Sequence, residues 1–255
     1  MRYFVRAEVD GEARFAELRG DQLKLWSDAP WLGGSPIRDL GPIADFTLLC
    51  PVIPSKIIGI GRNYRDHAKE LGGEVPSQPL MFLKPPSSLN APGKQVVLPA
   101  ASTRVDFEGE LAVIIGQRAR RVSTADALNH VFGFAAACDV TARDLQKSDG
   151  QWTRAKGFDT FCPISKVIAS GVALDDIRLT TTVNGVQRQS ATPRDMVFSV
   201  PELVSYASGV MTLEPGDLIL TGTPEGVGPM QPGDEVSVEI TPVGKLSFTA
   251  RGPED

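Results

Sequence analysis

Three acidic residues in apolar surroundings, Glu108, Glu110 and Asp139, have the side-chain type and spacing that could bind a cation. Residues 106–115 alternate with a period of two, which predicts a strand with both glutamates on one face and Cα atoms roughly 6.6 Å apart. Spacing alone favours a solvated acidic edge over a metal site. The apolar flanks oppose that interpretation, because buried like charges are costly without a metal or cationic partners.

Asp139 follows an apolar segment, residues 132–138, and precedes a predicted helix. Its carboxylate could interact with the free backbone N–H groups of that helix or bind a cation, and the sequence leaves both interpretations open. Together, the three carboxylates would form a hard, oxygen-rich site suited to Mg²⁺ or Mn²⁺. The chain has only two histidines, His67 and His130, which excludes a histidine-rich zinc site.

His67 and Glu70 are three residues apart, so a helix places them on one face. A short helix is predicted here, with Asn63 as its N-cap and Gly72-Gly73 as its end. A carboxylate beside an imidazole fixes its tautomer and makes a general base that can activate water. The alternative is a pair on a polar helix face in solvent, and the two residues by themselves favour it.

The elements that must position these side chains are mainly strands. Residues 1–27 alternate in hydrophobicity around an Asp10-Gly11 turn, and residues 28–55 are rich in proline and glycine. We therefore expect a small N-terminal β module over residues 1–50 and a catalytic domain over residues 51–255.

Further elements are predicted within the second domain. A helix starts at Ser123 or Thr124, and Thr141 caps another helix that runs through Gln146. Asn184-Gly185 joins a hairpin, and the Ser199-x-x-Glu202 capping box opens a helix. Strands outnumber helices and do not alternate regularly with them, which predicts a β-rich mixed α+β fold.

Composition excludes several classes of function. The net charge is -5 and no basic run is present, which argues against nucleic acid or an anionic membrane surface as a partner. Apolar stretches such as residues 131–138 are too short to span a bilayer, and the charged N-terminus does not resemble a signal peptide. Three cysteines without C-x-x-C spacing fit a reducing cytoplasm. The glycine-rich segments lack the spacing of dinucleotide and P-loop motifs, so a nucleotide enzyme is not expected.

Six short segments contain most of the residues that could do chemistry. They are Gly61-Arg62-Asn63-Tyr64-x-x-His67-x-x-Glu70, Phe82-x-Lys84-Pro85, Asp106-Phe107-Glu108-Gly109-Glu110-Leu111, Asp139-x-Thr141-Ala142-Arg143-Asp144-x-Gln146, Trp152-Thr153-x-Ala155-Lys156 and Gly222-Thr223-Pro224-x-Gly226-Val227-Gly228. In this order they resemble the fumarylacetoacetate hydrolase (FAH) superfamily. Residues 1–50 match less distinctly, and residues 241–246 are a loose version of the family's ending.

The resemblance implies an FAH-type mixed β-roll that forms a homodimer. It implies Mg²⁺ or Mn²⁺ at the positions that match Glu108, Glu110 and Asp139. It also implies a base dyad on a helix that orders when substrate binds, an active-site lysine, and contacts to the oxo-carboxylate end of the substrate. These roles fall on His67 and Glu70, on Lys156, and on Arg143, Gln146 and Thr223, respectively.

The resemblance further implies chemistry on a small 2-oxo acid or dicarboxylic acid. Such an acid can chelate the metal, which acts as a Lewis acid and stabilises the enolate that forms when the bond beyond C3 breaks. The leading prediction is C–C cleavage, by hydrolysis of an acylpyruvate or fumarylpyruvate or by decarboxylation of oxaloacetate. The alternatives are a 2-hydroxyhepta-2,4-diene-1,7-dioate isomerase or tautomerase, and a non-catalytic metabolite-binding relative.

Overall fold

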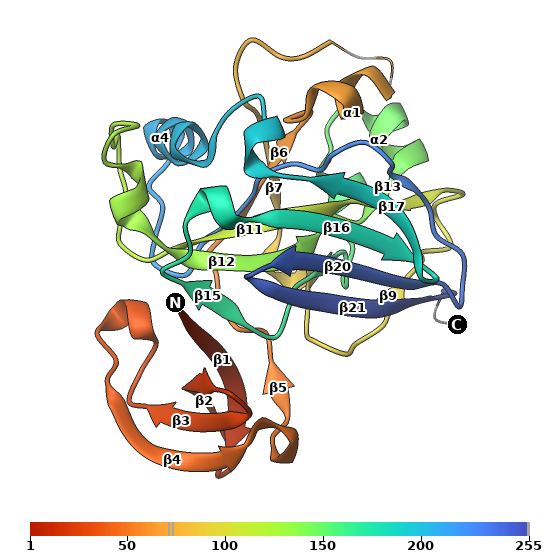
Figure 1. The fold of residues 1–255 in the computed structure, drawn as a ribbon. Helices are drawn as coiled ribbons and strands as arrows, with labels where there is room; N and C mark the ends of the chain where they lie inside the picture. The colour runs from red at the N-terminus through yellow and green to blue at the C-terminus, as the bar shows by residue number, and fades with distance from the viewer. Residues whose placement is uncertain (71, 73, 254–255) are drawn as a thin grey trace.

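Strands dominate the computed structural model, which describes residues 1–70, 72 and 74–253 (Figure 1). Within that range the largest sheet has eleven strands, with β18 and β6 parallel. Its order is β4 (Pro36–Pro42), β3 (Gln22–Trp26), β2 (Glu12–Arg19), β1 (Arg2–Val9), β15 (Ile168–Ser170), β12 (Val131–Cys138), β11 (Gly109–Ile115), β18 (Leu218–Leu220), β6 (Ile57–Gly61) and β7 (Leu80–Lys84), with β5 (Leu48–Leu49) beside β1. The predicted β-rich mixed α+β fold is confirmed.

A second sheet of five strands packs against β11 and β12. Its order is β17 (Val186–Ala191), β16 (Arg178–Val183), β20 (Glu235–Thr241), β21 (Gly244–Arg251) and β9 (Val96–Val97). Alternating residues of the two sheets, among them Val113, Phe134, Val238 and Leu246, form the main buried cluster. This packing makes the residues of β11 inaccessible on both faces, as the apolar run over residues 111–115 predicts for the second part of the strand.

The remaining elements gather around the ends of β11 and β12. Two small sheets join β13 (Thr141–Ala142), β10 (Val105–Phe107) and β19 (Gly228–Pro229), and pair β14 (Cys162–Pro163) with β8 (Leu89–Asn90). The α-helices are α1 (Arg65–Glu70), α2 (Arg143–Asp149), α3 (Thr153–Lys156) and α4 (Val200–Val210). Helices α1 and α2 lie near one another at one end of the molecule (Figure 1). Among the described residues, no helix is both long and apolar enough to cross a membrane.

The N-terminal strands form a curved ribbon below the rest of the molecule in Figure 1. The predicted turn between β1 and β2 is confirmed, since Asp10 and Gly11 both have positive φ. Strand β1 also pairs with β15, so the ribbon continues the large sheet. The proline-rich stretch contains a strand that the sequence did not predict, β4, which the ladder to β3 stabilises despite its two prolines.

Two predicted helix caps are wrong. The Asn63 side chain is fully buried and bonds to the backbone of Phe198 and Thr221, which are distant in sequence, instead of to the first turn of α1. Thr141 lies in β13 and donates to the carbonyl oxygen of Asp139, while the N-cap position of α2 is Ala142. Asn63 takes tertiary partners in place of a local cap, whereas the Thr141 hydroxyl takes a local carbonyl two residues before it.

The other local predictions have mixed outcomes. The Asn184-Gly185 hairpin and the Ser199–Glu202 capping box are confirmed. The helix expected from Ser123 is only a 3₁₀ turn at Ala127–His130. The end of α1 at Gly72 is consistent with its positive φ, whereas Leu71 and Gly73 lie outside the described residues.

Candidate active site

The three predicted acids converge on one buried point. The strand expected over residues 106–115 is interrupted at Glu108, which separates β10 from β11, so the two glutamates do not belong to one regular strand. Gly109 pairs with Cys138, and the N–H of Asp139 donates to the Glu108 carbonyl at 2.8 Å. One carboxylate oxygen from each acid lies within 4.8 Å of the others, and each residue is at most 4% exposed.

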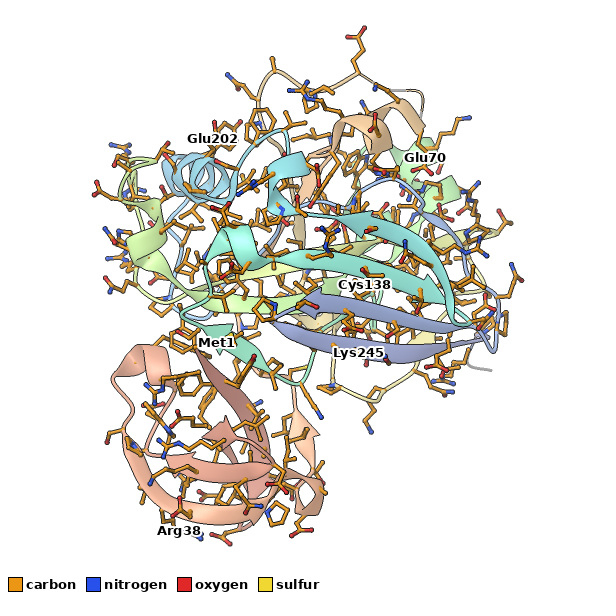
Figure 2. The ribbon with its side chains drawn as sticks, in the orientation of Figure 1. Met1, Arg38, Glu70, Cys138, Glu202 and Lys245 are labelled. Carbon is orange, nitrogen blue, oxygen red and sulfur yellow. The ribbon has the colours of Figure 1, made fainter. Side chains whose placement is uncertain are left out.

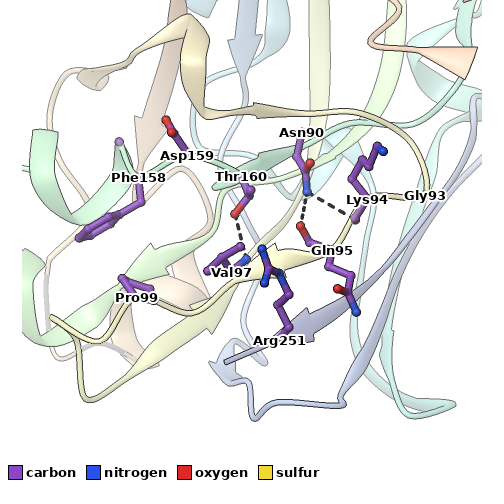
Figure 3. Close-up of a pocket in the computed structure, with 11 residues that line it drawn as sticks. Asn90, Gly93, Lys94, Gln95, Val97, Pro99, Phe158, Asp159, Thr160 and Arg251 are labelled. Atoms are coloured by element: carbon purple, nitrogen blue, oxygen red, sulfur yellow. Dashed lines mark hydrogen bonds between the residues drawn. The ribbon is translucent and has the colours of Figure 1, made fainter. Parts of the chain in front are cut away.

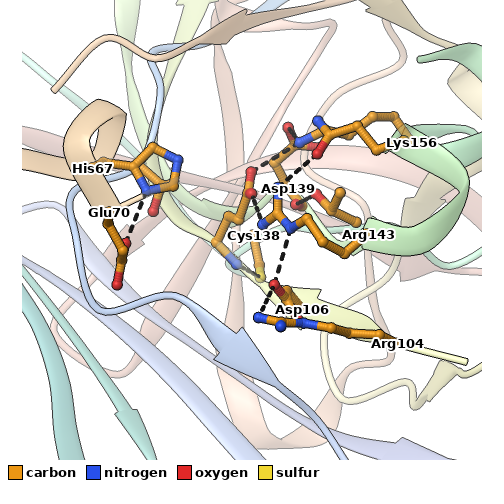
Figure 4. A network of polar contacts seen from close by, with 12 residues as sticks. His67, Glu70, Arg104, Asp106, Cys138, Asp139, Arg143 and Lys156 are labelled. Carbon is orange, nitrogen blue, oxygen red and sulfur yellow. Dashed lines mark hydrogen bonds and ion pairs between the residues drawn. The ribbon is translucent and has the colours of Figure 1, made fainter. Parts of the chain in front are cut away.

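Two buried lysines contact this carboxylate cluster, and Figure 4 shows one of them, Lys156, beside Asp139. Lys156 Nζ lies 2.8 Å from Glu108 Oε2 and also donates to Asp139 Oδ2. Lys84 Nζ lies 2.7 Å from Asp139 Oδ1 and donates to the carbonyl oxygen of Lys156. Lys84 had no predicted role, although a lysine that ends an otherwise apolar strand was a signal that its charge has a partner.

Arg143 connects the cluster to a second buried acid. Its guanidinium binds Glu108 Oε1, and its Nε lies 3.0 Å from Asp106 Oδ2. It also donates to Gln146 Oε1 at 2.7 Å. Arg104 completes the group with two bonds to Asp106 at 2.9 and 3.1 Å. Helix α2 therefore brings both Arg143 and Gln146 to the site.

Glu110 has a different electrostatic environment from Glu108. Burial raises the pKa of Glu108, but Lys156 and Arg143 outweigh burial and hold that pKa far below its ordinary value. Burial, with Asp139 and Glu108 nearby, raises the pKa of Glu110 well above its ordinary value, and its Oε2 accepts the Gly222 N–H at 2.7 Å. The environment of Glu108 therefore favours its charged form, whereas that of Glu110 favours its protonated form.

The donor set fits a hard divalent cation. All three side chains offer carboxylate oxygen, the ligand type that Mg²⁺ and Mn²⁺ prefer. Asp139 Oδ1 is buried and has no hydrogen bond within the described part of the chain, although the Lys84 ammonium lies beside it. A cation at this point would also favour the ionised form of Glu110 over the protonated one.

The His67–Glu70 pair is only partly exposed to solvent, because His67 is buried while the Glu70 side chain is 33% exposed. His67 is 4% exposed, and its Nδ1 lies 3.2 Å from Glu70 Oε2. The Gly226 N–H lies 3.1 and 3.3 Å from the two Glu70 oxygens. Figure 2 places Glu70 at the outer end of α1, whereas Cys138 lies inside the body. The loop around Gly226 thus holds the acid that orients the histidine.

One small cavity brings most of the predicted residues together. Its volume is about 40 Å³, room for about three water molecules. It is lined by His67, Glu108, Glu110, Arg143, Gln146, Lys156 and Thr223, with Ile60, Gly61, Arg62 and Trp152 in addition. Asp139 and Glu70 are not in its lining. Sequence reasoning gave no role to Arg62 or Trp152; the positive φ of Arg62 is unusual for a non-glycine residue and is often found at functional sites.

The Thr223 hydroxyl is already bonded twice. It donates to the Gly109 carbonyl at 2.9 Å and accepts from Gln189 Nε2 at 2.7 Å. Its hydrogen is therefore used, and toward a substrate the hydroxyl can act only as an acceptor.

A larger cavity of about 960 Å³ lies beyond α3, between β9 and the segment that follows Lys156 (Figure 3). Its lining includes Lys94, Asp159 and Arg251. With one carboxylate beside a lysine and an arginine, this cavity lacks the three-carboxylate donor set of the acidic cluster.

Comparison with known proteins agrees with this geometry. Residues 56–251 match the family described as fumarylacetoacetate (FAA) hydrolase C-terminal. The chain belongs to this FAH family.

Relatives within the FAH family have different activities. The chain is 46% identical over 200 residues to oxaloacetate tautomerase FAHD1, mitochondrial, of Arabidopsis thaliana. The aligned segment covers 76% of this chain and 90% of that protein. It is 39% identical to the 2-hydroxyhepta-2,4-diene-1,7-dioate isomerase from Mycobacterium marinum, with a TM-score of 0.90 and full coverage of both chains. Maleylpyruvate hydrolase from Sphingobium, solved with manganese(II) and pyruvate, has 32% identity, a TM-score of 0.80 and full coverage of both chains.

Proposed function

We propose that this protein is a divalent-metal-dependent enzyme that moves a proton at C3 of a small 2-oxo acid, with oxaloacetate tautomerisation as its reaction. The observation that carries the proposal is that one small cavity contains the histidine of a base dyad, a buried lysine and two of the three clustered carboxylates. Its volume of about 40 Å³ leaves no room for a long acyl chain in this arrangement. The tautomerase from Arabidopsis supports the same reaction.

Glu108, Glu110 and Asp139 would hold Mg²⁺ or Mn²⁺. When bound, the ion supplies Lewis acidity, drawing electron density from the substrate's carbonyl and carboxylate oxygens. Around it, Arg62, Arg143 and Gln146 would orient the carboxylates of the acid, since they line the cavity.

His67 is the base in this proposal. An ionised Glu70 can only accept hydrogen bonds, so Nδ1 of His67 carries the hydrogen that lies between them. This leaves the lone pair on Nε2, which can take a proton from C3 and return it at the enol oxygen. In the view of Figure 4, His67 lies on the opposite side of the carboxylate cluster from Lys156.

Lys156 is the hydrogen-bond donor rather than a second base. Burial lowers the pKa of its ammonium group, but Asp139 and Glu108 outweigh burial and raise that pKa above its ordinary value. A lysine that stays charged can stabilise negative charge that develops on the substrate oxygen. The two groups therefore have separate tasks, with proton transfer at His67 and charge stabilisation at Lys156.

C–C cleavage is the second candidate function, by acylpyruvate or fumarylpyruvate hydrolysis or by oxaloacetate decarboxylation. The dyad favours hydrolysis, because the Nε2 that accepts a carbon-bound proton can equally accept one from water. The maleylpyruvate hydrolase supports it. A longer substrate would require α1 to move, since α1 contributes His67 to the wall of the cavity.

A substrate panel tests the proposal. Purified protein with Mg²⁺ or Mn²⁺ is assayed against oxaloacetate, acetylpyruvate, fumarylpyruvate and 2-hydroxyhepta-2,4-diene-1,7-dioate. We expect the largest kcat/KM for enol–keto conversion of oxaloacetate, followed as loss of enol absorbance, with no net release of CO₂. If kcat/KM is larger for pyruvate release from an acylpyruvate, the proposed function is wrong and the reaction is hydrolysis.

The proposal includes a cytoplasmic homodimer that binds neither nucleic acid nor membranes. Sedimentation equilibrium tests the dimer, and a mass of 27.3 kDa at micromolar concentration would contradict it.

A further inference from the structure

Gln189 is a buried amide that the proposed mechanism does not use. It lies on β17, is 1% exposed, and its neighbours Gln187 and Arg188 are exposed. A buried amide is costly unless its donors and acceptor are bonded. The hydrogen-bond partners of the Gln189 amide therefore show which segments it holds in place.

The Gln189 amide closes a ring of three hydrogen bonds. Its Oε1 accepts the N–H of Gly109 at 3.0 Å, and its Nε2 donates to Thr223 Oγ1 at 2.7 Å. The Thr223 hydroxyl closes the ring by donating to the Gly109 carbonyl at 2.9 Å. Gly109 is the residue between two proposed metal ligands, so the ring fixes the backbone from which both extend.

The same amide holds a second segment. Its other N–H donates to the Pro224 carbonyl at 2.8 Å. Rotating the amide by half a turn would set donor against donor at Gly109 and acceptor against acceptor at Pro224, so the partners determine its orientation. With both N–H groups and the oxygen bonded, Gln189 joins β11 to the loop at residues 222–226.

That loop connects the two halves of the site. At one end the Gly222 N–H donates to Glu110 at 2.7 Å, and at the other the Gly226 N–H donates to Glu70. The loop also presses against β17, because a Cβ on Gly226 would lie 2.0 Å from the carbonyl oxygen of Arg188. Gln189 fixes the middle of this connection.

We propose that Gln189 is a positioning residue. It holds the backbone between the metal-binding glutamates and the loop that bonds to Glu70 at fixed positions relative to each other. Without its bonds the glutamates and the dyad would each find a wider range of positions. Partners behind metal ligands typically contribute 10–100-fold to metal affinity or activity. The kinetic part of the inference rests on the proposed function, whereas the metal-binding part does not.

The test is Gln189→Met, which preserves side-chain length and removes all three bonds. Gln187→Met is the matched control, since it makes the same change at an exposed position on the same strand. Mn²⁺ binding is measured by titration calorimetry well below the Tm of each variant. We expect Gln189→Met to weaken Mn²⁺ binding about tenfold and to lower kcat 10–100-fold with a smaller change in KM, while Gln187→Met matches the wild type.

A purely structural role predicts a different pattern. It would lower Tm and the fraction of active molecules but leave the Mn²⁺ affinity of the folded protein at the wild-type value, and that result would overturn the inference. If wild-type protein binds Mn²⁺ but does not convert oxaloacetate, only the proposed function fails. The affinity comparison still decides the role of Gln189.

The opposite side of the ring provides a second test if Gln189→Met does not fold. Thr223→Val removes the hydroxyl with little change of shape, and Thr223→Ser keeps it. We expect weaker Mn²⁺ binding for the valine variant and near wild-type binding for the serine variant. Equal affinities for the two would contradict the ring as a positioning device.

Discussion

The ammonium group of Lys156 lies 2.8 Å from Glu108 Oε2, so a buried side-chain cation contacts a carboxylate that would also bind the metal. Lys156→Met would leave Glu108 and Asp139 without this partner, and losing one member of a buried ion pair costs about 3 kcal/mol. We expect a lower Tm in metal-free buffer, a larger gain in Tm on adding Mn²⁺, and loss of tautomerase activity. Thermal melts with and without Mn²⁺ check this, with Lys166→Met as the exposed control. An unchanged melt in metal-free buffer would show that the pair is not needed for stability.

Removing one ligand tests the metal site itself. Glu108→Gln or Asp139→Asn replaces a charged oxygen donor with a neutral amide, so Mn²⁺ affinity and activity should fall together by at least tenfold. Calorimetry and the oxaloacetate assay are run on the same samples. Asp159→Asn, in the larger cavity, is the control and should match the wild type. Full activity of either ligand variant in metal-free buffer would refute the site.

Much of this fold follows from local patterns in the sequence. The hairpin turn at Asn184-Gly185 and the capping box at Ser199 each depend on residues a few positions apart, and both form as predicted. The caps assigned to Asn63 and Thr141 fail, since Asn63 bonds to distant backbone groups and Thr141 donates to the Asp139 carbonyl instead of capping α2. Asn63 bonds to residues more than 130 positions away, which a local pattern cannot reveal.

The site shows the same limit. The sequence indicated the acids, but not that Glu108 interrupts its strand, because the break depends on pairing with two different sheets. Lys84 reaches Asp139 across 55 positions, and Gln189 reaches Gly109 across 80. Such contacts exist only once the sheets have assembled. The only hint in the sequence is a polar residue at a position where the pattern predicts burial. For Gln189, in a hairpin strand with mostly polar residues, that hint is weak.

Glu110 predicts how metal binding depends on pH. Its pKa in the metal-free fold is raised by burial and by Asp139 and Glu108, so the folded state holds a proton there more tightly than the unfolded chain does. Its contribution to stability is complete below the ordinary value of 4.5 and is lost as pH rises toward the raised value. A metal ion must displace that proton, so Mn²⁺ affinity should increase by about tenfold per pH unit while Glu110 is protonated.

Calorimetric titrations between pH 5.5 and 8 measure this slope. Glu110→Gln cannot release a proton, so its weaker binding should lose the steep dependence. Glu239→Gln, an exposed substitution on β20, should retain it. A flat wild-type profile would mean that Glu110 is already ionised before the metal binds.

The two histidines of the chain offer a matched pair for testing the base. His67→Ala removes the lone pair that would take a proton from C3 or from water, so tautomerisation and acylpyruvate hydrolysis should fall at least 100-fold. Oxaloacetate decarboxylation activates no water, so any such activity should decline much less. His130→Ala, at the opposite end of β12 from Asp139, should leave all rates unchanged. Stopped-flow loss of enol absorbance, pyruvate release and CO₂ release separate the three reactions, and wild-type tautomerisation by His67→Ala would transfer the role of base to another group.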